Sequence, residues 1–155
     1  MIAIKKVAAS ALCACAGAIF YAPSAWALLP IQHWTEPNGA KVWLVESPVI
    51  PMVDVQVDFD GGSRRDPAAQ AGLASSVALM ASKGVKGGKE GQGAEPALDE
   101  NALGEAWADL GAGFEAGADN DALHYSLRSL TDAPLLDRAA RLAARQLAEP
   151  SWPAD

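Results

Sequence analysis

The stretch that decides the fold is MVDVQVDFDGGSRRDP, residues 52–67. Its first half alternates apolar with polar side chains, a period of two that is typical of a β-strand with one buried face. We expect the apolar side chains to face covering helices, because a register slip of one residue would bury polar groups instead. The apolar set is Val53, Val55, Val57 and Phe59, and the polar set is Asp54, Gln56 and Asp58. Glycines 61 and 62 then turn the chain, and Asp66-Pro67 can start a helix.

Three further segments carry helical patterns. Residues 71–82 are rich in alanine, leucine, valine and methionine and have almost no polar face, which predicts a buried helix. Asp99 can cap a helix that runs to Leu110. Residues 133–147 have apolar side chains at helical spacing and therefore predict an amphipathic helix. Its outward arginines 138, 141 and 145 are interpreted as a solvated face.

Two hairpins complete the expected architecture. Runs at 31–35 and 41–46 flank Asn38-Gly39, a strong hairpin signal. Runs at 114–118 and 122–130 flank Asp119-Asn120-Asp121 and predict a second hairpin. The order of these elements predicts an α+β domain with a mostly antiparallel sheet covered by helices.

Composition excludes several functional classes. The 155 residues carry a formal charge of −7, which disfavours a nucleic-acid binder that neutralises phosphates. The only cysteines, Cys13 and Cys15, allow neither a disulfide framework nor a cysteine-based zinc site. The glycine-rich stretch 84–94 is predicted to be a flexible loop. It is no phosphate-binding loop, since Gly88-Lys89 is followed by Glu90 rather than serine or threonine.

The N-terminus resembles an export signal. Lys5-Lys6 precedes the apolar stretch 7–21 and then Ala25-Trp26-Ala27, a pattern that predicts cleavage after Ala27. The expected division is therefore a signal peptide at 1–27 and a domain at 28–155, exported to a bacterial periplasm and free of the membrane after cleavage. Two alternatives are a single membrane anchor and a lipoprotein acylated at Cys15.

Several motifs resemble one peptidase family in their order along the chain. These are the strand and turn at 53–67, the Gly-Leu-Ala of 72–74, Lys83-Gly84, the stretch 112–116 and Glu149-Pro150-Ser151-Trp152. On these residues the chain is identified as a member of the pitrilysin/insulinase (inverzincin) family of zinc peptidases, matching its N-terminal domain. The resemblance implies that family's fold in incomplete form, and we expect the chain to be a fragment of a longer protein.

The resemblance also locates a degenerate active site. In active members the helix after Gly-Leu-Ala carries His-x-x-Glu-His, whose histidines bind zinc and whose glutamate activates water. The corresponding window here is SSVAL, residues 75–79, so Ser75 and Leu79 replace the ligands and Ala78 replaces the base. None of the three can do the same chemistry. We expect a non-catalytic member with no metal and no cofactor.

Other candidate residues have plainer interpretations. His33 and His124 lie on different predicted strands without a third ligand at a set spacing, so both are interpreted as structural. No Gly-x-Ser-x-Gly elbow surrounds Ser75 and Ser76, which disfavours nucleophilic catalysis. The strand aspartates are interpreted as a solvated face.

Three functions remain open. The first is a non-catalytic subunit that supports peptide binding by an active zinc-bearing homologue. The family's substrates add to a sheet edge, which the resemblance places at Gly113, Phe114, Glu115, Ala116 and Gly117. The second is a metalloendopeptidase whose zinc site lies in sequence outside this chain, and the third is a free-standing periplasmic peptide-binding module.

Overall fold

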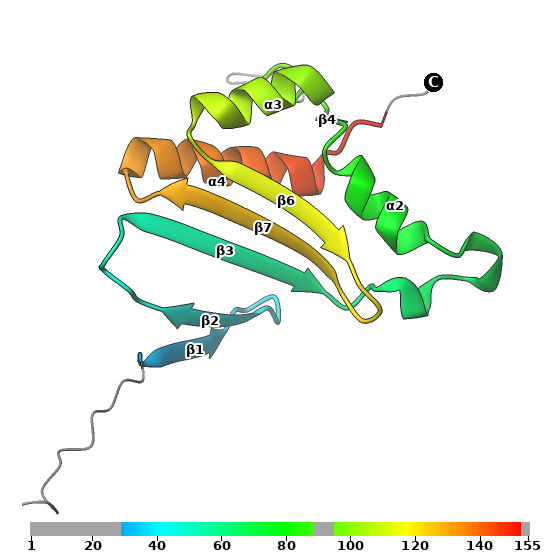
Figure 1. Ribbon diagram of the computed structural model, residues 1–155, viewed down its shortest axis with the longest axis horizontal. Helices are drawn as coiled ribbons and strands as arrows, with labels where there is room; N and C mark the ends of the chain where they lie inside the picture. Colours follow the sequence, from blue (N-terminus) through cyan, green and yellow to red (C-terminus); the bar gives the residue numbers. More distant parts are fainter. Residues whose placement is uncertain (1–28, 89–94, 153–155) are drawn as a thin grey trace, which may run out of the picture. The chain divides into compact units, whose positions relative to one another are not determined.

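The computed structural model describes residues 29–88 and 95–152, and the chain divides into two compact units between Pro48 and Val49. In the first unit, β1 (Ile31–Thr35) pairs antiparallel with β2 (Lys41–Val45), as Figure 1 shows. Gly39 takes φ +90° in the connecting turn, which explains the preference for glycine there. The first predicted hairpin is confirmed. The predicted signal peptide at 1–27 lies outside the described residues.

The second unit contains an antiparallel sheet in the order β3-β7-β6. Its strands are β3 (Met52–Phe59), β6 (Gly113–Ala118) and β7 (Leu123–Leu130). The predicted alternation in β3 is confirmed, because Val55 and Val57 pair directly with the buried residues Leu127 and Tyr125. Covering of this face is incomplete: Val55 is 40% exposed and Phe59 is 49% exposed. The reason is that helix α4 packs mainly on β7.

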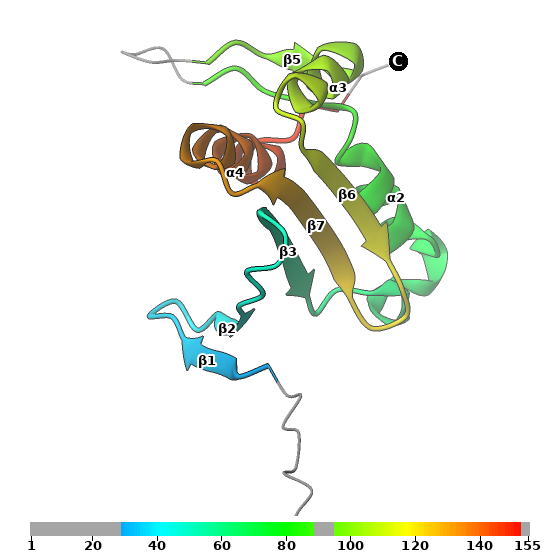
Figure 2. The same ribbon diagram turned by 60° about the vertical axis from the view of Figure 1, so that its left-hand side comes forward.

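Three α-helices accompany this sheet in the described part of the chain: α2 (Leu73–Met80), α3 (Glu100–Asp109) and α4 (Ala133–Ala148). Asp99 caps α3 as predicted, its carboxylate accepting the backbone N–H of Ala102 at 2.9 Å. Asp132 caps α4 in the same way, through the N–H of Leu135. Figures 1 and 2 show α2 running alongside β6, and α4 lies against β7. The predicted α+β fold with an antiparallel sheet is confirmed.

The core lies between the sheet and the helices. Trp107 of α3 stacks on Phe114 of β6 with ring centroids 5.6 Å apart. The buried residues that pack together here are Val85, Leu103, Trp107, Leu110, Leu127, Ala139, Leu142 and Ala143. None of the described helices is long and apolar enough to cross a membrane.

The prediction of a buried helix at 71–82 is wrong in both length and burial. After Pro67 the chain forms only a short 3-10 turn at Ala68–Gln70, and α2 begins at Leu73. Only Ala74 and Ala78 within the helix are buried, whereas Leu79 is 65% exposed. The physical reason is that α2 packs beside β6 along a narrow row of alanines, which leaves its larger apolar side chains outside.

The prediction of a flexible loop at 84–94 is wrong for its first residues. Gly84–Val85 forms strand β4, which pairs antiparallel with β5 (Leu98–Asp99). Val85 is completely buried, and the N–H of Ser151 donates to the carbonyl oxygen of Gly84 at 2.9 Å. These two residues are therefore part of the core, while residues 89–94 lie outside the described residues.

Candidate functional site

Helix α2 carries the three residues that the resemblance places at the degenerate motif positions, and Asp66 fixes where this helix starts. Its carboxylate accepts the backbone N–H of Gly72 at 2.8 Å and of Ala74 at 3.1 Å. Gly72 takes φ +93°, a conformation that favours glycine. The aspartate of the 52–67 stretch thus caps α2 from several residues upstream.

Ser75, Ala78 and Leu79 do not share one environment on this helix. Ser75 and Leu79 are exposed, while Ala78 is 5% exposed and packs toward the sheet. A seryl oxygen is a poor zinc ligand, and the side chains of Ala78 and Leu79 offer no donor. Across residues 29–88 and 95–152, no three histidine, cysteine, aspartate or glutamate side chains form a group that could hold a metal ion. The residues at the motif positions do not fit zinc.

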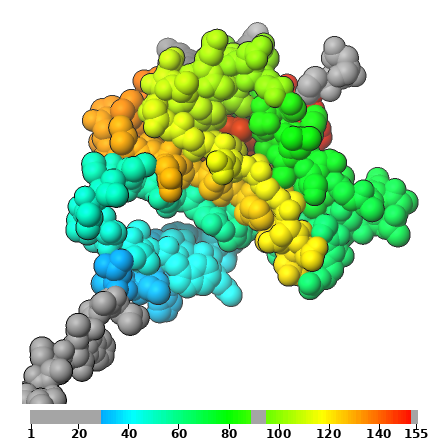
Figure 3. Space-filling model, in the orientation of Figure 1, coloured from blue at the N-terminus to red at the C-terminus, as the bar shows by residue number. Residues whose placement is uncertain are grey.

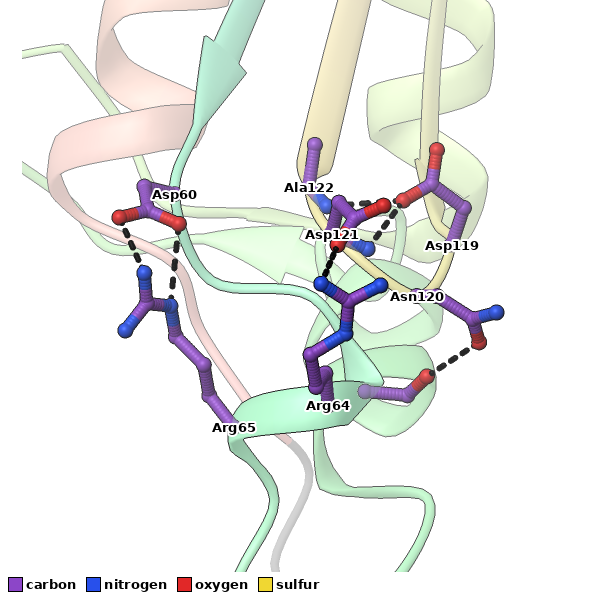
Figure 4. A network of polar contacts seen from close by, with 8 residues as sticks. Asp60, Arg64, Arg65, Asp119, Asn120, Asp121 and Ala122 are labelled. Atoms are coloured by element: carbon purple, nitrogen blue, oxygen red, sulfur yellow. Dashed lines mark hydrogen bonds and ion pairs between the residues drawn. The ribbon is translucent and has the colours of Figure 1, made fainter.

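The glycine-rich turn after β3 fixes the β6–β7 hairpin (Figure 4). The N–H of Ser63 donates to the carbonyl oxygen of Asp119 at 2.8 Å, and Arg64 pairs with Asp121 at 2.7 Å. A Cβ on Gly62 would lie 2.5 Å from backbone atoms of this hairpin, so only glycine allows the approach. The turn therefore sets the position of β6 relative to α2.

Strand β6 is an edge strand of the described sheet. It pairs with β7 on one side, and its other side runs beside α2. The five residues expected to bind peptide, Gly113 to Gly117, all lie in this strand. Phe114 and Ala116 are half-buried and face the helices, whereas Glu115 is exposed. An edge strand of this kind presents unpaired backbone N–H and C=O groups that can accept another strand.

Two adjoining hollows lie along this free edge. The first, about 320 Å³, lies between α2 and β6 and is lined by Ala78, Leu79, Ser82, Phe114, Glu115, Ala116 and Gln146. The second, about 330 Å³, lies between α3 and β6 and is lined by Ser82, Glu100, Leu103, Gly104, Trp107, Gly113, Phe114 and Gln146. They share three lining residues, so together they form one groove. Figure 3 shows the end of α4, in red, at the base of this groove, between α3, β6 and α2.

Gln146 forms the floor of the groove, and sequence analysis missed it. Its side chain is 3% exposed and joins three helical segments: its oxygen accepts the indole N–H of Trp107, and its nitrogen donates to the carbonyl oxygen of Ala81. The sequence feature that could have revealed this role is the position of a glutamine on the apolar face of an amphipathic helix.

Arg145 corrects another expectation, since it does not belong to a solvated face. Its side chain is 16% exposed, pairs with Glu95 and donates to the carbonyl oxygens of Lys86 and Pro96 at 3.1 and 2.8 Å. Its neighbours Arg138 and Arg141 are exposed as predicted. Arg145 therefore holds the two ends of the 86–96 segment against α4.

The sheet's other face is polar and carries an ion pair between Arg128 and Asp54. The Arg128 guanidinium donates to Asp54 at 2.6 Å, and this hydrogen bond lowers the pKa of Asp54. Both side chains are more than 60% exposed, so the pair adds little stability. A Cβ on Gly117 would lie 2.6 Å from the imidazole of His124, so this ring packs closely against the glycine. This contact supports the structural interpretation of His124, and His33 belongs to β1 in the first unit.

Comparisons with known proteins connect this geometry to a family. No family model and no curated protein sequence matches the chain. A solved structure does: the crystal structure of the peptidase M16 inactive domain from Pseudomonas fluorescens is 35% identical, covers 82% of this chain and superposes with a TM-score of 0.71. The chain belongs to the M16 peptidase family. M16 is the family of pitrilysin and insulinase, so the resemblance found in the sequence is confirmed.

A second solved structure has the same fold at lower identity. A protease from Helicobacter pylori is 19% identical, covers 83% of this chain and gives a TM-score of 0.62. The chain spans 28% of the length of each of these two proteins. The Pseudomonas fluorescens structure is described as an inactive domain, and in this chain the resemblance places Ser75, Ala78 and Leu79 at the motif positions.

Proposed function

We propose that this M16 domain binds extended peptide along the free edge of β6 without cleaving it, and so supports an active zinc-bearing homologue. The observation that carries the proposal is the groove beside β6, which lies next to a helix whose motif positions lack ligands and base. The domain keeps the elements that position β6 and α2, namely Gly62, Asp66 and the β6–β7 hairpin.

Peptide binding at this edge requires no metal. The backbone N–H and C=O groups of an extended peptide would pair with those of β6, which supplies affinity for any sequence, while the hollows would receive alternate side chains. Hydrolysis would require a polarised water and a base, and neither Ala78 nor Leu79 can provide them. Catalysis would therefore belong to the homologue.

Two further parts of the proposal concern partner and location. The similarity to an inactive M16 domain supports pairing with an active subunit that carries His-x-x-Glu-His. The lysine pair, apolar stretch and Ala-x-Ala pattern of residues 1–27 support export to a periplasm. Mass measurement of the exported protein tests the location: a chain that begins at Leu28 is expected, and a chain that retains Met1 would contradict it.

Backbone methylation of the ligand tests the binding mode. In an added strand, alternate N–H groups point toward β6 and the intervening ones point away. One N-methyl group at an inward position should therefore abolish binding measured by fluorescence anisotropy, and the same group one residue further along should leave it almost unchanged. Equal effects at neighbouring positions would exclude strand addition.

The supporting role has its own measurement. Peptidase activity of an active M16 homologue encoded in the same genome should rise, or its KM should fall, when this chain is added. A matched control is the chain with Gly62→Val, which removes the close approach that fixes the hairpin. Peptide binding with no effect on any homologue would favour a free-standing binding module instead.

A further inference from the structure

We propose that the lost catalytic position has become an apolar side-chain pocket, and that the domain selects cationic, extended peptides with apolar side chains at positions i and i+2. This inference rests on the proposed peptide binding at β6 and adds the substrate class.

The first step concerns the pocket on α2. Leu79, at a position where active relatives have a zinc ligand, lines the first hollow together with Ala78, Phe114 and Ala116. Leu79 is 65% exposed, so a large apolar surface remains uncovered in the described residues. A peptide side chain that covers it would gain the free energy of apolar burial. An apolar pocket therefore occupies the position at which active relatives bind zinc.

The second step concerns spacing. The second hollow is lined by Leu103, Trp107 and Phe114, and it adjoins the first, which Phe114 also lines. Side chains i and i+2 of an extended strand point to the same face and are about 7 Å apart. A strand added to β6 would therefore place two alternate side chains toward the helices, one for each hollow. Volumes near the lower limit for ligand pockets, about 300 Å³, suit single side chains.

The third step concerns charge. The charged residues that line the two hollows are Glu100 and Glu115, and both are acidic. Lys83 pairs with Glu100 at 2.7 Å, whereas Glu115 is exposed at the strand edge, where Arg128 of the polar face is close enough to interact with its charge. The whole chain carries a formal charge of −7. Electrostatic complementarity therefore favours peptides with basic residues flanking the apolar pair.

Synthetic peptides test the spacing directly. Three lysine-flanked peptides of equal length are compared: one carries two leucines at i and i+2, one carries them at i and i+1, and one has serines in their place. We expect the i, i+2 peptide to bind the 155-residue chain about tenfold more tightly than the i, i+1 peptide. Equal affinity of these two peptides would contradict the assignment of two side-chain pockets, while the proposed peptide binding at the edge of β6 would still stand. No binding of any peptide would overturn the proposed function as well.

Variants of α2 and α3 test the pocket residues. Leu79→Ser should weaken binding of the i, i+2 peptide about tenfold and leave binding of the serine peptide unaffected. Leu73→Ser is the matched control, since Leu73 is 43% exposed on the same helix and lines neither hollow. Gly104→Phe should fill the second hollow, because a Cβ there meets nothing within 4 Å. Equal loss from Leu73→Ser and Leu79→Ser would contradict the assignment.

Discussion

The indole N–H of Trp107 donates to the side-chain oxygen of Gln146 at 3.0 Å, inside the core and directly beneath the groove. The same amide donates to the carbonyl oxygen of Ala81 at the end of α2. One buried side chain thus connects α3, α4 and α2, the three helices that border the free edge of β6. The shape of the groove therefore depends on core packing through Gln146 and does not require a bound metal ion.

Replacing Gln146 should destabilise the domain. Gln146→Leu would leave the Trp107 indole N–H and the Ala81 carbonyl buried without partners, at a cost of about 1–3 kcal/mol in the free energy of unfolding. Urea denaturation measures this change. Gln70→Leu is the control, since Gln70 is exposed. Equal stability of the two variants would show that the Gln146 bridge is unimportant.

Neighbouring glycines should respond differently to alanine. Gly62→Ala places a Cβ 2.5 Å from backbone atoms of Asn120, Asp121 and Ala122, whereas a Cβ on Gly61 meets nothing within 4 Å. Gly62→Ala should lower the free energy of unfolding by about 1–3 kcal/mol, because the turn and the hairpin backbone must move apart to make room for the Cβ. Gly61→Ala should alter stability by less than about 1 kcal/mol. Similar unfolding midpoints for both would argue against the close approach of turn and hairpin.

Asp66→Ala should loosen the start of α2. The variant loses the carboxylate that accepts two backbone N–H groups, and the expected cost is about 1 kcal/mol, as for other helix caps. Asp58→Ala is the matched control on the polar face of β3, where the carboxylate contacts only Gln56 among the described side chains. A control as destabilised as the variant would contradict the capping role.

The hairpin aspartate should titrate below its ordinary range. Backbone N–H groups of Ala122 and then Asp121 donate to Asp119 and lower its pKa. A depressed folded pKa means that the carboxylate stabilises the fold above the unfolded pKa of about 3.9, and that this contribution is lost as the pH falls through the folded pKa. NMR titration of the Asp119 carboxyl carbon tests this. The same midpoint in folded protein and in urea would refute it.

Introducing a pair of histidines on α2 should raise the affinity for zinc. Ser75→His together with Leu79→His places two ligands four residues apart on exposed positions of one helix. This double variant should bind zinc, measured by calorimetry, more tightly than the unmodified chain or the single variant Leu79→His. Stoichiometric, chelator-sensitive zinc in the unmodified chain would contradict the statement that Ser75, Ala78 and Leu79 do not fit the metal.

Much of the fold could be predicted because its strands and α4 have strong periodicity. The alternation at 53–59 and the Asn38-Gly39 turn reflect local chemistry, which sequence reports directly. Burial of α2 could not be predicted in this way. Its composition shows only that the helix is apolar, whereas exposure of Leu79 depends on which surfaces pack against it. A two-residue strand such as Gly84–Val85 has no periodicity to detect.

The candidate site shows the same division. The motif resemblance pointed to Ser75, Ala78, Leu79 and the strand at 113–117, and in the structure Ala78 and Leu79 line one hollow together with Phe114, Glu115 and Ala116 of that strand. Arg145 and Gln146 are consecutive in the sequence yet serve different contacts, one with the 86–96 segment and one with Trp107. Side-chain roles of this kind depend on partners that are distant in the sequence. Periodicity alone therefore could not identify the floor of the groove.

Hydrogen exchange at the amides of β6 tests the central claim most directly. The unmodified chain is measured with and without the lysine-flanked peptide that carries leucines at i and i+2, and the peptide is recovered afterwards for mass analysis. The account predicts slower exchange at alternate amides within Gly113–Ala118 and an intact peptide. Unchanged exchange in β6 at saturating peptide, or a cleaved peptide, would contradict it.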